Sequence, residues 1–500
     1  MVSQRVYWSL LIGIYLVLAT LHYIALEPTS LYRQVIYGIV LITIMPLSYV
    51  TLQTILSIHY GKTGTKYDRV AFPDLPKVAV ILGIYNDFTP HHFRETMINN
   101  PGFDYFLLSD SDLKHTETEQ AFCHQYNVHH IHRENRRGKK AGAINDWAKT
   151  HLSGYSYFAP LDKDSVLGKD NIKQMLEYAE SPSNRVYGAF QSKIKSLSGA
   201  SVFSNLRSTI ANLYLGQYPR NDARSLGEAI YWGHNALVRS EAFLGVGGQD
   251  ENHLNEDISF TMRMRVAGWK VAYLTDVQSY EEQPGDLPSE IERLSRWMRG
   301  SYESSVLALL NVKRIGYGTC WLIALSGLLY FSAVLLCILL TLTAVNTVFS
   351  LGQLSTTQLS RVAVVILLVH TVGILYLGPI IPMKKNTRMV KVLGLLLLNT
   401  VISIPSMLRA LLVTAKFVVS RKAPWSPTRN ENVHRSFPES FIFALPEFVF
   451  GLFLLYSFSF GGVSTLLQFL LWIASFMVAP VAIYFSSRSS DNYFKKLLYE

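Results

Sequence analysis

Cysteine is scarce in this sequence: three of its 500 residues are cysteines, Cys123, Cys320 and Cys337. They lie far apart and match no spacing typical of a zinc site or a disulfide framework. Charged residues are also few, at 16%, whereas hydrophobic residues reach 49%. No internal repeat or low-complexity tract is visible. A disulfide-stabilised scaffold, a cysteine-ligated metal centre and a repeat architecture are therefore not expected.

The basic residues outnumber the acidic ones, and the formal net charge is +10. Such a balance raises the question of a nucleic-acid partner. Many of the basic residues, however, flank long apolar runs, as membrane orientation requires. We therefore expect a lipid bilayer as a partner and no nucleic acid. A chain of this length is also too long for one ordinary core, so at least two structural units are expected.

Apolar runs at both ends of the chain predict membrane spans. Residues 6–26, preceded by Arg5, are long enough to cross a hydrocarbon core of about 30 Å, and 36–58 follow at once. With no small-residue cleavage site, 1–60 are expected to be a transmembrane hairpin and not a signal peptide. Two further pairs of spans are predicted. The region 317–383 holds the spans 321–345 and 362–381. The region 440–486 holds the spans 441–458 and 466–485, and a tail, 487–500, follows it.

The region 76–310 has a different character, with frequent charges, glycines and short apolar strings between polar helical stretches. This alternation is typical of an α/β domain with a parallel sheet, whose ligands bind at the carboxyl ends of the strands. Several carboxylates stand at those ends. The predicted strands are 77–83, 105–109, 157–161 and 186–191.

Asp162 and Asp164 directly follow the predicted strand 157–161. Carboxylate oxygens at such a position suit Mg²⁺ or Mn²⁺, which would neutralise the diphosphate of a departing nucleotide. The plainer interpretation is a solvated acidic turn. The neighbouring strand ends favour the metal, because they carry similar groups.

Tyr85 and Asp87 close the first strand, where an aromatic ring and a carboxylate could hold a nucleotide base. Asp110 closes the second strand. The run RRGKKAGAIN at 136–145, which includes Lys140, then supplies cations and glycines that suit phosphate oxygens. A solvated charged face is the alternative for this run.

Asp257 precedes a helix-like segment that runs to Ala267. An inverting sugar transfer needs one base to take the proton of the acceptor hydroxyl, and Asp257 is the candidate. Its alternative role is that of a helix N-cap. Farther along, RLSRW at 293–297 offers Arg296 for the acceptor or diphosphate and Trp297 as an apolar face for a sugar ring; Trp297 could instead be a packing residue.

The order of Asp-x-Asp, Glu-Asp and x-x-Arg-Trp between membrane hairpins resembles the family 2 processive glycosyltransferases, such as cellulose and hyaluronan synthases. The sequence is most similar to the glucans biosynthesis glucosyltransferase H family, which makes osmoregulated periplasmic glucans in Gram-negative bacteria. The last motif begins with Arg293, as in that family, whereas most processive relatives have Gln. Lys163 is a departure, since the family usually has Ala there. The matching strings are LDKDS (161–165), YWGHNA (231–236), SYEE (279–282) and RLSRW (293–297).

The resemblance implies a cytoplasmic α/β nucleotide-sugar-binding domain of GT-A type between transmembrane helices of the bacterial inner membrane. It implies UDP-glucose as the donor, a divalent ion, inversion to a β-linkage, and a growing glucan as the acceptor, with export and a periplasmic glucan-handling protein as a further partner. Asp162, Asp164, Tyr85, Asp87, Asp110 and Lys140 would hold the donor and metal. His234, Asn235, Arg293, Arg296 and Trp297 would line the acceptor and diphosphate side. The alternatives are transfer of a single sugar to a lipid phosphate carrier, and a membrane protein that only binds a nucleotide sugar.

Residues 390–420 are apolar enough for a further span, but basic residues stand at both borders, against the positive-inside tendency. Pro405 would also interrupt a helix. We therefore expect 389–438 to hold an interfacial or re-entrant element with a gating loop at 425–430, leaving six true spans and both termini inside. Glu447 and His370 lie within predicted spans, where they could line a polymer path; Glu447 could instead reach the interface. The bordering residues are Lys384, Lys385, Arg388, Lys391, Arg421, Lys422, Arg429 and Arg435.

Overall fold

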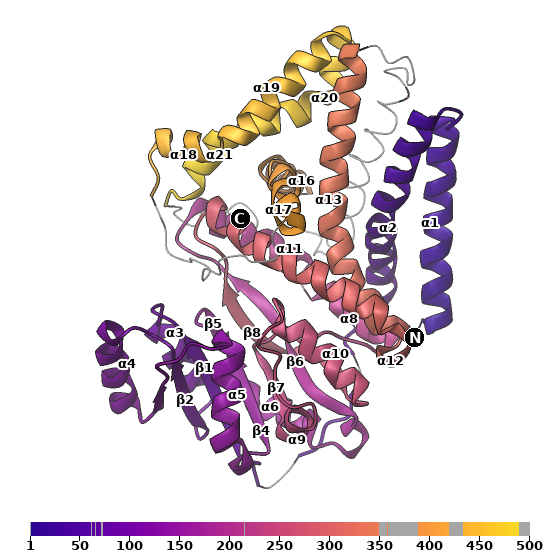
Figure 1. Ribbon diagram of the computed structural model, residues 1–500. Helices are drawn as coiled ribbons and strands as arrows, with labels where there is room; N and C mark the ends of the chain where they lie inside the picture. The colour runs from indigo at the N-terminus through magenta and orange to yellow at the C-terminus, as the bar shows by residue number, and fades with distance from the viewer. Residues whose placement is uncertain are drawn as a thin grey trace.

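A computed structural model places an α/β domain beneath a group of long apolar helices, with α11 (Leu287–Leu310) lying between the two (Figure 1). The predicted span 362–381, His370 and the loop 425–430 lie outside the described residues. The structure describes residues 2–349 apart from 62, 66, 72, 73 and 215, residue 358, and residues 389–419 and 434–489.

One eight-stranded sheet, in the order β3-β2-β1-β4-β7-β6-β8-β5, forms the centre of the α/β domain. β1, β2 and β4 coincide with three predicted strands to within a residue at each end, and β6 extends the fourth. The strands are β1 (Val78–Ile84), β2 (Asp104–Ser109), β3 (His129–His132), β4 (Tyr157–Leu161), β5 (Ser165–Leu167), β6 (Tyr187–Leu197), β7 (Ala236–Arg239) and β8 (Lys270–Glu282).

The prediction of a parallel sheet is confirmed for six strands, which include all four predicted ones, and is wrong for the two short strands β5 and β7. β3, β2, β1, β4, β6 and β8 run in one direction, whereas β7 is antiparallel to both β4 and β6, and β5 is antiparallel to β8. β5 follows β4 after the segment 162–164 alone, and a parallel crossover needs a dozen or more residues. The aspartate motif therefore leads the chain directly from one part of the mixed sheet to its other edge.

Helices cover both faces of this sheet (Figure 1). Alternate residues of β1 point to opposite faces, so Val80 and Leu82 pack in one core cluster and Ala79 and Ile81 in the other. Trp147 is buried in the second cluster. The helices of the domain are α3 (Pro90–Asn99), α4 (Leu113–Tyr126), α5 (Lys139–His151), α6 (Asn171–Ala179), α7 (Val202–Tyr214), α8 (Gln217–Leu226), α9 (Ser240–Gly245) and α10 (Glu256–Val266), with short turns at Leu152–Gly154 and Pro182–Asn184.

Three helices confirm predicted apolar segments and are long enough to cross a membrane: α1 (Gln4–Leu26), α2 (Leu31–Tyr60) and α13 (Tyr317–Phe349), the last following the short α12 (Val312–Ile315). The final predicted pair is bent. α18 (Phe437–Phe443) meets α19 (Leu445–Ser459) at 67°, and α20 (Gly462–Met477) meets α21 (Ala479–Ser486) at 44°. Each bent pair is either one broken span or a re-entrant loop, so the described residues hold four to six candidate spans, as expected of a membrane protein.

The segment 390–420 forms α16 (Met389–Ser403) and α17 (Ser406–Val419), and the helix is interrupted at Pro405 as predicted. Residues Leu397–Val419 are nevertheless apolar and long enough to span. Figure 1 shows α16 and α17 nearly end-on, whereas α1, α2 and α13 lie lengthwise. This arrangement agrees with an element that lies in the membrane plane, which stays a prediction.

Candidate active site

The carboxylate of Asp162, at the end of β4, meets two basic side chains from other elements. Lys140, in the first turn of α5, forms an ion pair with Asp162 Oδ1 and donates to the carbonyl of Gly233 at 3.2 Å. His234 places Nδ1 3.3 Å from Asp162 Oδ2. Asp162 is therefore paired with basic side chains, while its own side chain remains 38% exposed.

The charges of these neighbouring side chains shift the pKa values of Asp162 and His234. Burial acts to raise the pKa of Asp162, but the charges of Lys140 and His234 outweigh it and lower that pKa to about 2. Burial likewise acts to lower the pKa of His234, while Asp162 and Glu281, which is 3.3 Å from Nε2, raise it to about 9. At neutral pH the cluster thus holds an ionised carboxylate between an ammonium and an imidazolium.

Asp257 lies in the first turn of α10, where burial and then the charge of Glu256 raise its pKa to about 7. The N-cap of this helix is Asn255, so the N-cap interpretation of Asp257 is wrong. Its Oδ1 accepts from the backbone N–H of Ile258 at 2.8 Å. A carboxylate that titrates near neutral pH is suited to act as a general base.

Gly233 brings Asp257 against the cluster. It has a φ of +80°, and a Cβ at this position would lie 3.2 Å from Asp257 Cβ. Gly233 also accepts from Lys140 and precedes His234. The structure therefore gathers four predicted site residues that are far apart in the sequence: Lys140, Asp162, His234 and Asp257.

The groups predicted to hold the nucleotide base lie beside the aspartate motif. Lys163, the departure from the resembled family, places Nζ 3.2 Å from Asp87 Oδ2, so its charge faces this carboxylate. Asp87 Oδ1 accepts from the backbone N–H of Tyr85 at 2.9 Å. The guanidinium of Arg136 stacks on the Tyr85 ring, and Asp164 is buried, with 9% exposure.

Asp110 is engaged by a residue that the sequence analysis passed over. Arg133 donates to both of its carboxylate oxygens, at 2.7 and 2.6 Å. Arg137, in the basic run, pairs with Asp146 at 2.9 Å and with Glu251. This run is therefore not a plain solvated face. In this arrangement Lys140 forms its ion pair with Asp162 of the aspartate motif, whereas Asp110 forms its ion pair with Arg133.

On α11, Arg293 is buried and donates to Glu290 at 2.9 Å and to Gln283 at 3.1 Å. Its guanidinium also lies 4.6 Å from the centre of the Trp297 ring. Trp297 is 41% exposed, so it is not a buried packing residue. Arg296 is close enough for its charge to favour the ionised form of Asp162.

Asn235 links two strands through hydrogen bonds. Its backbone N–H donates to the carbonyl of Pro160 at 2.9 Å and its side-chain amide to that of Tyr280 at 3.3 Å, which joins the end of β4 to β8. Glu281, beside Tyr280, is the partner of His234 that the sequence analysis left without a role. The sequence feature that could have indicated Glu281 is a pair of adjacent glutamates, Glu281 and Glu282, at the end of a strand.

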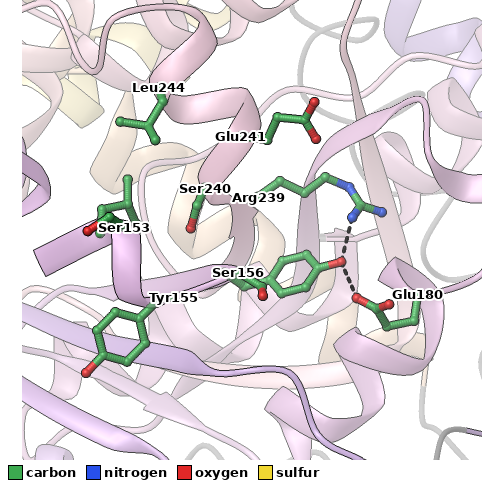
Figure 2. Close-up of a pocket in the computed structure, with 10 residues that line it drawn as sticks. Ser153, Tyr155, Ser156, Glu180, Arg239, Ser240, Glu241 and Leu244 are labelled. Carbon is green, nitrogen blue, oxygen red and sulfur yellow. Dashed lines mark hydrogen bonds between the residues drawn. The ribbon is translucent and has the colours of Figure 1, made fainter.

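A cavity lies elsewhere in the α/β domain. It holds about 410 Å³ and is lined by residues at the amino end of β4, opposite the end that carries Asp162. Figure 2 shows that Arg239 and Glu180 both meet the hydroxyl oxygen at the tip of one tyrosine side chain: Arg239 donates to the Tyr157 hydroxyl, which donates to Glu180 at 2.6 Å. No predicted site residue lines it.

Comparison with known proteins identifies related sequences. Residues 157–380 match the family described as Glycosyl transferase family group 2. Proteins named Glucans biosynthesis glucosyltransferase H are similar to this chain. The one from Rhodopseudomonas palustris is 27% identical over 46% of the chain, and the one from Bradyrhizobium diazoefficiens is 29% identical over 45%. The matches cover 35% and 34% of those proteins, so the chain spans about a third of the length of these relatives.

Among solved structures, a mannosyltransferase from Pyrobaculum calidifontis in complex with GDP-Man and Mn²⁺ matches with a TM-score of 0.49 and 12% identity. That match covers 77% of this chain and 99% of the other. The family match, together with the mixed sheet flanked by apolar helices, confirms the predicted α/β domain of GT-A type in a polytopic membrane protein.

Proposed function

We propose that the protein polymerises a sugar from a UDP-sugar donor into a β-glucan, because residues 157–380 match glycosyl transferase family group 2. Glucose is the sugar that the names of the similar proteins favour. The observation that carries the proposal is the contact between Asp257, whose pKa is about 7, and Gly233. Gly233 precedes His234 and accepts a hydrogen bond from Lys140.

In the proposed reaction Asp257 takes the proton of an acceptor hydroxyl as the hydroxyl oxygen attacks the anomeric carbon. The bond between that carbon and the diphosphate oxygen breaks, and its electron pair leaves with the diphosphate. A single base on the side opposite the leaving group gives inversion, hence a β-linkage from an α-linked donor. A base with a pKa near the working pH is half ionised when free and still accepts a proton readily.

Lys140, His234 and Arg296 would hold the diphosphate, since all three are cations close to Asp162. Asp162 and Asp164 offer carboxylate oxygens, which fit Mg²⁺ or Mn²⁺. Such an ion, when bound, would neutralise the charge that develops on the leaving diphosphate. Tyr85 and Asp87, beside the motif, remain the proposed contacts of the uracil base, and Asp110 would reach the donor only by exchanging its pairing with Arg133.

The acceptor side would be formed by α11. Trp297 presents a partly exposed ring on which a sugar can stack. The guanidinium of Arg293 lies over this ring in a cation–π contact. α11 also lies between the α/β domain and the apolar helices (Figure 1), so a product leaving Trp297 is near the membrane. We therefore include export across the inner membrane, with the catalytic domain on the cytoplasmic side, in the proposal.

The test is to incubate the purified protein with radiolabelled UDP-sugars and to size the product. A labelled polymer, formed from UDP-glucose in preference to other UDP-hexoses, is the expected outcome. A single sugar on a lipid would show that the enzyme serves a lipid carrier, and no transfer from any donor would contradict the proposal. Sealed vesicles with the catalytic domain outward add the export test, because exported glucan is protected from added glucanase.

A further inference from the structure

Two neighbouring histidines in the first turn of α3 face the end of β8, outside the group of residues described above. His92 is buried, with 4% exposure, whereas its neighbour His91 is exposed. Glu282, the last residue of β8, joins them. The nearest ligand atoms of all three residues lie within 4.8 Å of one another.

The Nε2 atom of His92 is 3.1 Å from His91 Nε2 and 3.3 Å from Glu282 Oε1. A hydrogen on His92 Nε2 can serve the carboxylate as an ion pair, with the lone pair of His91 as a second acceptor. When both nitrogens are unprotonated, their lone pairs and the carboxylate oxygen lie close together, and a single cation can satisfy all three groups.

The spacing also suits such an ion. Two ligands at about 2.0–2.1 Å from a tetrahedral zinc ion are separated by about 3.3–3.4 Å. The two distances at His92 Nε2, 3.1 and 3.3 Å, are close to this edge length. Two imidazole nitrogens and a carboxylate oxygen form a donor set that transition metals accept and Mg²⁺ does not prefer.

We propose that His91, His92 and Glu282 bind a divalent transition-metal ion of the Zn²⁺ or Mn²⁺ class. The site adjoins the aspartate motif, because the backbone N–H of Glu282 donates to the carbonyl of Asp164 at 3.3 Å. Lys163, a cation whose charge acts on Glu282, has its ammonium directed to Asp87. The ion would join the first turn of α3 to the end of β8 next to the proposed diphosphate position, with a ligand set of its own.

The test uses the full-length protein in detergent, purified without a polyhistidine tag and stripped with EDTA. Mn²⁺ is titrated and followed by electron paramagnetic resonance, with electron spin echo modulation to detect coupling to ¹⁴N. We expect one Mn²⁺ that is coupled to imidazole nitrogen and displaced by Zn²⁺, in addition to any Mn²⁺ that the proposed site at Asp162 and Asp164 holds. His91→Gln, at an exposed position, should remove most of the coupling and weaken binding at least about tenfold, in line with the 10–100-fold that lost supporting contacts cost at metal sites.

The matched control is His124→Gln, which changes an exposed histidine of α4 and should leave the spectrum unchanged. Glu282→Gln should weaken binding and keep the nitrogen coupling. A wild-type spectrum with oxygen ligands alone, or a His91→Gln variant that binds as the wild type does, would overturn the proposal. No sugar nucleotide is present in this measurement, so its failure and a failure of the proposed glycosyl transfer are distinguishable.

Discussion

Gly233 and Asp257 are in close contact: a Cβ on Gly233 would lie 3.2 Å from Asp257 Cβ and 3.6 Å from its Oδ2. The φ of +80° at Gly233 would strain any L side chain at this position as well. The glycine therefore allows the proposed base to lie directly against the segment that carries His234. This contact holds the proposed base close to the cations that are proposed to bind the diphosphate.

Asp257→Asn is expected to keep nucleotide binding and to lose transfer. Amidation preserves the shape of the side chain but removes the base, which typically costs about 10²–10⁴ in rate. UDP binding by calorimetry and transfer with radiolabelled donor check the two parts. Glu117→Gln, at an exposed position of α4, is the control and should remain fully active. Near-normal turnover in the Asn variant would refute the role of Asp257.

The pH dependence of kcat/KM should report the same carboxylate. The pKa of Asp257 is raised to about 7, and only the ionised form accepts a proton, so activity should fall below this pH and level off above it. The measurement is kcat/KM for the UDP-sugar in overlapping buffers at constant ionic strength. An acidic inflection near the ordinary value of about 4 for aspartate would mean that Asp257 is not the base.

Asp164→Ala should abolish the divalent-dependent activity. Asp164 is buried at the aspartate motif, and its removal would take one oxygen ligand from the proposed Mg²⁺ or Mn²⁺ site. Activity is measured against metal concentration after exhaustive chelation, with Asp74→Ala at an exposed position as the control. Transfer that survives both the substitution and chelation excludes the metal from the mechanism.

Glu447 is 2% exposed and accepts hydrogen bonds from Arg409 of α17, one of them 2.9 Å long, so its carboxylate is buried in the protein and does not face lipid. Glu447→Leu should leave Arg409 without its partner carboxylate and lower stability by about 3–5 kcal/mol, the cost of breaking a buried pair. Thermal unfolding in detergent measures this loss. The double change Arg409→Met and Glu447→Leu should restore most of it. If the double variant also synthesises and exports normally, Glu447 is not part of a polymer path.

Cysteine labelling tests the in-plane position of α16 and α17. Single cysteines at Asn386 and Ser420, which lie outside the described residues, are placed in a background that lacks Cys123, Cys320 and Cys337. With both positions on the cytoplasmic side, neither should react with a membrane-impermeant reagent in intact cells. Both should react once the cells are opened. Labelling of only one of them in intact cells would show that the segment spans.

Local patterns in the sequence were enough to find the main elements. Strands such as Val78–Ile84 are continuous apolar strings with polar residues at their ends, and Gln4–Leu26 is an apolar stretch of membrane length. The reversed directions of β5 and β7 were beyond such patterns. β5 and β7 have three and four residues, too few to show a period, and their pairing depends on partners far along the chain.

For the site, the sequence by itself determined which residue types stand at the strand ends and in which order the motifs occur, because strand exits and motifs are local properties of the chain. Only the tertiary structure decided which of these groups meet. It placed His234 between Asp162 and Glu281, and it turned Asp110 toward Arg133. It also gave Asp257 a pKa of about 7, because burial and neighbouring charge are properties of a folded environment that residue spacing does not contain.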